Sequence, residues 1–211
     1  WISAAHGHVE VVQCLIDAGA SKDKAEKTGS TALQVAARNG QLEVVDCLVK
    51  ATADVNKADR FGISPLRISA ASGRLDVVKH LFSANARLEQ ADLEGHNALW
   101  MAAYTGQLQV VEYLVAAKAN MECRDAKEET PLGCAASRGH EEIVQCLVQH
   151  RAELNRPGRN DQTPLLAAVL HGHCQIVHSL LEARAEHHRS DWFGRSPLLL
   201  ASSTGDMGSS G

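Results

Sequence analysis

Glycine recurs in this chain of 211 residues at a constant interval of 33 residues. The positions are Gly7, Gly40, Gly73, Gly106, Gly139, Gly172 and Gly205. The ten residues that end at each of the last six glycines share one pattern, for example TALQVAARNG from Thr31 and TPLGCAASRG from Thr130. A second apolar segment follows each glycine except the last, such as LEVVDCLV from Leu42. A period of this length predicts stacked supersecondary units, each of which packs mainly against its neighbours.

Each unit has the sequence signals of two short helices joined by a tight turn. A Ser or Thr suited to cap the first helix stands at Thr31, Ser64, Thr130, Thr163 and Ser196. Proline follows at the first helical position, where its missing N–H costs little, at Pro65, Pro131, Pro164 and Pro197. Alanine pairs such as Ala36–Ala37 allow close helix packing, and Val44, Val45 and Leu48 form an apolar stripe on the second helix. We expect the recurring glycine to adopt a positive φ in the turn between the two helices.

These segments resemble the ankyrin repeat, whose 33-residue unit carries the motif T-P-L-H-x-A-A. The resemblance covers residues 1–206 and implies an all-α repeat solenoid of helix-turn-helix units joined by β-hairpin or turn loops. We expect a single array with a partial repeat at 1–24, repeats starting near 25, 58, 91, 124 and 157, and a partial repeat at 190–206. Residues 207–211 read as a linker or an appended tail. Because neither end carries a polar capping repeat, we expect a monomeric segment of a larger chain.

The chain departs from the family motif at two positions. The histidine of the first helix is replaced in every unit, by Trp1, Gln34, Arg67, Trp100, Gly133, Leu166 and Leu199. The resemblance therefore implies that the hydrogen bonds by which this histidine ties adjacent repeats are absent. The glycine that ends the second helix survives only as Gly19, and its counterparts are Thr52, Asn85, Lys118, Arg151 and Arg184. If the backbone stays left-handed there, Thr52 is strained by roughly 1 kcal/mol.

Composition excludes several classes of function. Only 4% of the residues are aromatic although 45% are hydrophobic, so small aliphatic side chains must form the core. A net charge of −4 argues against a protein built around nucleic acid. No apolar run is long enough to span a membrane, and the first residues show no recognisable signal peptide. The six cysteines fall at apolar repeat positions such as Cys14, Cys47 and Cys146. We therefore expect reduced thiols and a cytoplasmic location, with the nucleus as an alternative.

No catalytic, phosphate-binding or zinc-protease motif occurs in the sequence, so we predict neither an enzyme nor a cofactor. His171, His173, Cys174 and His178 are the one cluster of metal-ligand types, with His187 and His188 nearby in sequence. His173 occupies the same repeat position as His8 and His140, which favours a structural role. The sequence therefore predicts solvated or structural histidines rather than a metal site.

The resemblance implies that loop tips and the exposed ends of first helices line a concave groove that binds a protein or peptide. The side chains that we assign to this groove are Arg38, Arg60, Phe61, Leu93, Tyr104, Lys127, Arg138, Arg159, Leu170, His171, Trp192 and Phe193. We expect Tyr104 and Trp192 to be exposed, whereas Phe61 and Phe193 either bind a partner or brace a neighbouring loop.

The charges at the variable groove positions favour an acidic partner. Basic residues outnumber acidic ones there by eight to two, which predicts a partner that carries acidic segments. The basic residues are Lys27, Arg38, Arg60, Arg124, Lys127, Arg138, Arg159 and Arg195, and the acidic ones are Glu94 and Glu129. The loop acids Glu26, Asp59, Asp92, Asp125 and Asp191 would cancel most of this excess. We interpret them as turn-forming residues bonded to nearby backbone N–H groups.

Two further hypotheses remain open at this stage. The first is that the array serves as a scaffold or regulatory arm of a larger enzyme or channel, without an activity of its own. Separately, Leu48 and the segment Asp54–Asn56 resemble the pattern that asparaginyl hydroxylases modify in ankyrin repeats, with Asn56 as the target. A looser copy ends at Asn155. The alternative is that Asn56 simply closes its loop.

Overall fold

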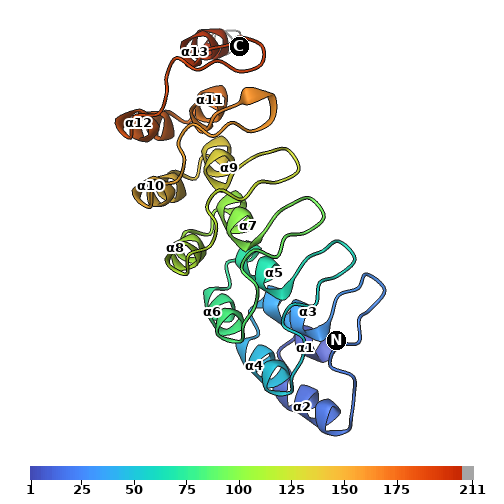
Figure 1. Cartoon of the computed structure of the whole chain (residues 1–211). Coiled ribbons are helices and arrows are strands. Elements are labelled where there is room, and N and C mark those ends of the chain that lie inside the picture. Colours follow the sequence, from blue (N-terminus) through green and yellow to red (C-terminus); the bar gives the residue numbers. More distant parts are fainter. Residues whose placement is uncertain (206–211) are drawn as a thin grey trace. The chain divides into compact units, whose positions relative to one another are not determined.

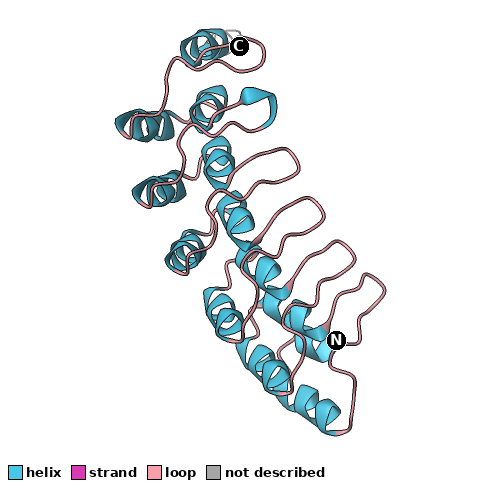
Figure 2. Cartoon of the chain, viewed as in Figure 1, coloured by secondary structure: helices cyan, strands magenta, loops and turns pink. Residues whose placement is uncertain are grey.

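The computed structural model describes residues 1–205, so the suggested tail at 207–211 lies outside the described residues. Within them the regular structure is entirely helical, and the connecting segments are loops without strands (Figure 2). The fold class is therefore an all-α repeat solenoid, as predicted, and of the two expected connections the turn loop is the one formed. No helix in this part of the chain is both long and apolar enough to cross a membrane.

The chain divides into two compact units, and the first contains residues Trp1–Leu114. Its first helices are α1 (Ile2–Ala5), α3 (Ala32–Asn39), α5 (Pro65–Ala71) and α7 (Ala98–Thr105). Its second helices are α2 (Val9–Asp17), α4 (Leu42–Lys50), α6 (Leu75–Ser83) and α8 (Leu108–Ala116), whose last two residues lie beyond the unit. Within this unit the first helices stack in one row, the second helices form another row, and the long loops project beside the first helices (Figure 1).

The second unit begins at Val115 and repeats the same arrangement. Its first helices are α9 (Pro131–Arg138), α11 (Pro164–Leu170) and α13 (Pro197–Gly205). Its second helices are α10 (Glu141–Gln149) and α12 (Cys174–Glu182). The loop between α10 and α11 also contains a short 3-10 helix, η1 (Arg159–Asp161).

Side-chain caps fix where the first helices begin. Thr31 accepts a hydrogen bond from the backbone N–H of Gln34, and the Gln34 side chain accepts one from the N–H of Thr31. This reciprocal pair is a capping box, which satisfies two backbone donors that a helix start leaves open. Ser64, Asn97, Thr130, Thr163 and Ser196 cap the other first helices with their side-chain oxygens. The predicted caps are confirmed, and Asn97 fills the same role in its repeat.

The turn glycine ends the first helix with a left-handed residue, as predicted. Its φ lies between 67° and 79° at Gly7, Gly40, Gly73, Gly106, Gly139 and Gly172. A side chain from the next repeat covers some of these glycines. A Cβ on Gly40 would approach the Arg74 side chain to 2.9 Å, and one on Gly139 would approach the His173 ring to 2.7 Å. Glycine is thus required both by the backbone conformation and by contact between repeats.

Small aliphatic side chains form the core within each unit. Ala36 and Ala37 have no exposed surface, and Val44, Val45 and Leu48 are at most 2% exposed. One leucine per repeat is fully buried at the same 33-residue interval, at Leu33, Leu66, Leu99, Leu132 and Leu165. The predicted close packing of first and second helices is therefore present.

Five non-glycine residues end second helices in the left-handed region. Thr52, Asn85, Lys118, Arg151 and Arg184 have φ values between 64° and 71°. Thr52 is the β-branched member of this set, for which this conformation is least favourable. Its hydroxyl bonds to the Lys22 ammonium at 2.7 Å, but that contact is exposed.

We expect Thr52→Gly to raise the free energy of unfolding by about 1 kcal/mol, because glycine removes the Cβ strain while the lost surface hydrogen bond contributes little. Chemical denaturation of both proteins measures the difference. Asn85→Gly is the matched control and should change stability less, because asparagine tolerates the left-handed region. A melting temperature lowered by Thr52→Gly would contradict the strain argument.

Candidate protein-interaction surface

Six loop tips occur at the repeat interval, and the same backbone hydrogen bond closes each of them. The N–H of the first residue donates to the carbonyl of the fifth in the segments 26–30, 59–63, 92–96, 125–129, 158–162 and 191–195. Neighbouring tips within a unit are also joined, because Leu93 N–H donates to Phe61 O at 3.0 Å and Trp192 N–H donates to Asn160 O at 2.8 Å. These bonds hold the tips in a fixed arrangement within each unit.

The loop aspartates point into their own tips. Asp59 Oδ1 accepts the N–H groups of Phe61 and Ile63, both at 2.9 Å. Asp92, Asp125 and Asp191 make the equivalent pair of bonds two and four residues ahead. The turn-forming interpretation is confirmed for these four. It is wrong for Glu26, whose carboxylate instead accepts a hydrogen bond from the Thr28 hydroxyl.

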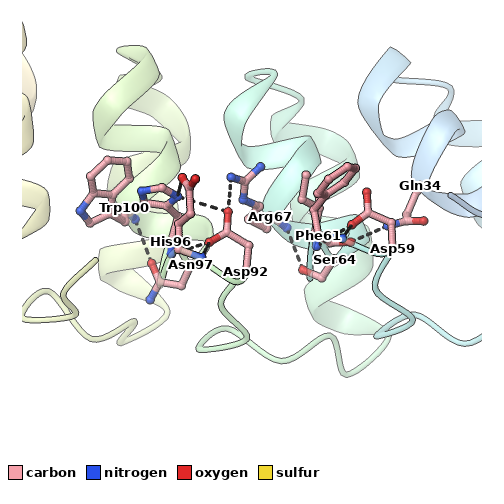
Figure 3. A network of polar contacts seen from close by, with 11 residues as sticks. Gln34, Asp59, Phe61, Ser64, Arg67, Asp92, His96, Asn97 and Trp100 are labelled. Atoms are coloured by element: carbon pink, nitrogen blue, oxygen red, sulfur yellow. Dashed lines mark hydrogen bonds and ion pairs between the residues drawn. The ribbon is translucent and has the colours of Figure 1, made fainter. Parts of the chain in front are cut away.

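Side chains at the former histidine position do connect adjacent repeats, which corrects the expectation that such bonds are absent. The Gln34 amide donates to the carbonyl of Ile63 in the next loop. Arg67 forms an ion pair with Asp92, and the two side chains are 10% and 6% exposed (Figure 3). Glutamine and arginine are long enough to reach a loop acceptor across the repeat interface, so they replace the histidine bond by different chemistry.

The Asp92 carboxylate collects several donors besides Arg67. His96 Nδ1 lies 3.2 Å from its Oδ2, and the His96 backbone N–H donates to its Oδ1 at 2.9 Å. Burial alone would raise the pKa of Asp92, but the His96 N–H and the charge of Arg67 outweigh burial and hold the pKa below its usual value. Asp92 therefore remains a buried carboxylate that joins two repeats.

Trp100 fills the same position in the next repeat with a stack of rings. Its ring lies 4.1 Å from that of His96 and 5.2 Å from that of Tyr104, measured between centroids. Trp100 is 3% exposed, and Tyr104 is only partly exposed. The prediction that Tyr104 is an exposed ring is therefore wrong, because the alignment along α7 places it against Trp100, one helical turn away.

The loop tips instead expose other large apolar side chains. Trp192 is 75% exposed, as predicted, and Leu93 is 77% exposed. Phe61 and Phe193 are 59% and 66% exposed, so neither is buried as a brace under a neighbouring loop. The Phe193 ring packs on the Arg195 guanidinium of its own tip at 5.0 Å.

The basic residues of the predicted groove divide into two groups. Arg38, Arg60, Lys127, Arg138 and Arg159 are exposed, as is His171, whereas Leu170 is half-buried on α11. Arg124 is paired with Glu128, and Arg195 is paired with Asp191 at 2.7 Å. These two pairs reduce the excess of positive charge that the sequence suggests.

The histidines near α12 have separate protein partners. His173 Nε2 donates to the Ser137 carbonyl of the preceding repeat at 3.1 Å, and His178 lies 3.1 Å from Glu182 on the same helix. No group of three metal-ligating side chains gathers anywhere in residues 1–205. No disulfide joins any of the six cysteines, all of which belong to the described residues.

Asn56 ties its loop to the following repeat. Its side-chain oxygen accepts the N–H of Arg87 at 2.8 Å, and its amide nitrogen lies 3.4 Å from Asn85 O. Its own N–H donates to Asp54 Oδ1, so the loop closure weighed above is only part of its role. Asn155 accepts the N–H of Glu186 in the same way. A hydroxylase would have to separate these contacts, and modification of Asn56 stays a hypothesis that an added oxygen in the intact mass would test.

We expect Asn56→Ala to lower the free energy of unfolding by about 1–2 kcal/mol, because the Arg87 N–H would lose its acceptor at a repeat interface. Chemical denaturation measures the change. Asn56→Asp keeps an accepting oxygen at the same place and should lose less stability. Equal losses of stability in the two variants would show that the hydrogen bond from the Arg87 N–H to Asn56 does not stabilise the fold.

Comparison with known proteins decides the family. A family model of three consecutive ankyrin repeats matches residues 1–59, 53–125 and 99–191. The chain belongs to the ankyrin-repeat family. Among solved structures, this ankyrin-repeat protein is similar to the human ASB11 ankyrin repeat domain, with a TM-score of 0.86 and 26% sequence identity over 94% of this chain and 89% of that chain. No curated protein sequence matches it significantly. Ankyrin repeats are in general non-catalytic protein-interaction modules.

Proposed function

We propose that this ankyrin-repeat protein binds a partner protein or peptide through its loop tips and the adjoining ends of its first helices. The observation that carries the proposal is the exposure of Phe61, Leu93, Trp192 and Phe193, each at 59% or more, at the tips of loops in both units. Large apolar side chains are costly to leave in water, and aromatic side chains frequently anchor protein interfaces.

The surrounding charge favours a partner with acidic segments. Arg60 adjoins Phe61 in one tip, and Lys127 and Arg159 are exposed on tips of the second unit. The loop aspartates bond inward to backbone N–H groups, so their charge is partly shielded by those dipoles. Exposed cations beside apolar anchors steer an acidic segment towards the tips and make its binding sensitive to salt.

Preorganisation supports the same function. The tip-to-tip hydrogen bonds Leu93–Phe61 and Trp192–Asn160 fix the backbone that carries the anchors. A partner that binds such a surface orders few additional residues, which lowers the entropic cost of association.

A pull-down from cell lysate tests the proposal, with quantitative mass spectrometry of the retained proteins. The first variant is Phe61→Ala/Leu93→Ala, which removes two anchors of the first unit. The matched control is Leu42→Ala/Leu181→Ala, which removes side chains 38% and 42% exposed on the second helices α4 and α12.

We expect a protein that the wild type and the control retain at low salt, and that the tip variant retains less. Moderate salt should weaken its retention in all three samples. A partner retained equally by wild type and tip variant, but lost from the control, would place the interface on the second helices and overturn the proposal.

A further inference from the structure

Two glycines of the second unit replace both members of the buried ion pair found in the first. Arg67 of α5 pairs with Asp92 at the start of the following loop tip. Two repeats later, the equivalent positions are Gly133 of α9 and Gly158 at the start of the next tip. Since both side chains are missing together, the interface between these two repeats lacks the atoms that fill it in the first unit.

A cavity of about 170 Å³ lies beside these two glycines. Gly133, Gly158, Glu129, Arg156 and Gln162 are among the residues that line it. A Cβ on either glycine would lie no closer than 3.5 Å to the surrounding atoms, and Gly158 has a negative φ of −91°. Neither close packing nor backbone conformation therefore demands glycine at these places. The exposed residues Lys127 and Arg159 also line the cavity, so it opens to solvent beside them.

The charge around the cavity is mainly positive. Lys127, Arg156 and Arg159 contribute three cations, and Glu129 is the one acidic residue among the residues that line it. Arg156 Nη1 lies 3.0 Å from the carboxylate of Glu153 and 4.0 Å from that of Glu122, but the Arg156 Nε–H is buried and has no hydrogen-bond partner. A guanidinium placed here as in the first unit would face three like charges.

Glu129 is itself held towards its neutral form. Burial and the nearby negative charge of Asp125 raise its pKa, and Lys127 only partly opposes them. The raised pKa favours protonation of Glu129, and a protonated carboxyl group can donate a hydrogen bond to an anion.

We propose that this cavity binds the carboxylate of an Asp or Glu side chain in an acidic segment of the partner. Lys127 and Arg159 attract the segment, and the carboxylate enters the space that the absent side chains leave between Gly133 and Gly158. Arg156 supplies positive charge at the wall, and the Glu129 carboxyl donates a hydrogen bond when it is protonated. This inference rests on the interaction function proposed above and names the chemistry that one part of the surface recognises.

Peptide titration followed by NMR tests the proposal on the whole chain. The probe is the capped peptide Gly-Glu-Glu-Gly, compared with Gly-Lys-Lys-Gly and Gly-Gln-Gln-Gly, and the readout is the amide shift of Gly133 and Gly158 in ¹⁵N-labelled protein. We expect saturable shifts with the glutamate peptide, which weaken with salt, and none with the other two.

Glu129→Gln separates an anion site from a cation site by the sign of its effect. We expect the Glu129→Gln protein to bind the glutamate peptide roughly three- to tenfold more tightly at pH 7, because the substitution removes the one acidic group among the residues that line the cavity. Wild-type affinity should rise as pH falls through the raised pKa of Glu129, and that rise should be absent in Glu129→Gln. Glu142→Gln, an equal charge change at an exposed site on α10, should have little effect.

Filling the cavity should block binding. Gly133→Gln introduces the residue type that Gln34 provides at the equivalent position, so the peptide should no longer shift the Gly158 amide signal. Gly133→Ala is the folding control. Its Gly158 amide signal should still shift with the peptide, which would show that α9 still folds. Tighter binding of the lysine peptide, weaker binding by Glu129→Gln, or equal competition from inorganic phosphate would each overturn the proposal. If none of the peptides shifts Gly133 or Gly158 while the tips still retain a partner, only the cavity assignment fails. Peptide binding without any tip-dependent partner would instead contradict the proposed function.

Discussion

Asp92→Ala is expected to lower the free energy of unfolding by roughly 3–5 kcal/mol, the range for breaking a buried ion pair. The variant leaves Arg67 without its carboxylate at a site where that side chain is 10% exposed. It also removes the acceptor for the N–H groups of Glu94 and His96, which opens the loop tip. Since one residue holds both the tip and the neighbouring repeat, the loss should exceed that of a surface ion pair.

Asp59→Ala is the matched control for this result. Asp59 makes the same two bonds to its own tip, but the first-helix residue facing it, Gln34, bonds to the Ile63 carbonyl rather than forming an ion pair. Denaturation of both variants therefore separates the stability lost with the tip hydrogen bonds from the stability lost with the Arg67–Asp92 ion pair. A similar loss in the two would mean that the Arg67–Asp92 pair contributes little.

The same pair makes a defined contribution to the acid stability of the protein. The pKa of Asp92 is lower in the folded chain than the usual value of about 3.9. The stability that this depression supplies is fully present above the usual value and is lost as pH falls through the lower folded value. The difference between wild type and Asp92→Ala should therefore shrink below about pH 4.

Trp192→Ala/Phe193→Ala is expected to weaken partner binding by about 2–4 kcal/mol, or roughly 30- to 1000-fold, if these rings anchor the second unit. Both side chains are at least 66% exposed, so their removal should leave the melting temperature nearly unchanged. Titration of the retained partner by calorimetry or interferometry measures the affinity of each protein.

Leu198→Ala is a suitable control for the loss of exposed apolar area, because Leu198 is 81% exposed on α13 rather than on a loop tip. Leu198→Ala should weaken partner binding by less than about 0.5 kcal/mol, because apolar area removed away from the loop tips should not affect the interface. A comparable loss of affinity in Leu198→Ala, or a large fall in the melting temperature of Trp192→Ala/Phe193→Ala, would show that the two rings do not anchor the partner.

Local sequence signals were enough to predict the helical framework. Thr31 and Pro65 mark helix starts, and Gly40 marks a turn, because a cap, a fixed φ and a positive φ are properties of a few neighbouring residues. The 33-residue interval extended these local assignments to the whole described chain, since each repeat packs in the same way. The left-handed conformation of Thr52 followed from the same repeat register.

The candidate site was less predictable because its members lie in different repeats. Gln34 and Arg67 share one repeat position, yet one bonds to a carbonyl and the other to a carboxylate. Tyr104 has the sequence features of an exposed ring, but it lies one helical turn from Trp100 and stacks on it. In each case the partner is selected by side-chain length and direction across an interface, which repeat position alone does not specify.

The sequence by itself determined the repeat family, the starts of the first helices and the apolar core of this protein. Only the tertiary structure decided which side chains join neighbouring repeats, which rings remain exposed, and that Gly133 and Gly158 share one cavity. The reason is physical. Helix formation and capping depend on residues within one or two turns, whereas exposure, ion pairing and cavities depend on residues that meet only after the repeats have stacked.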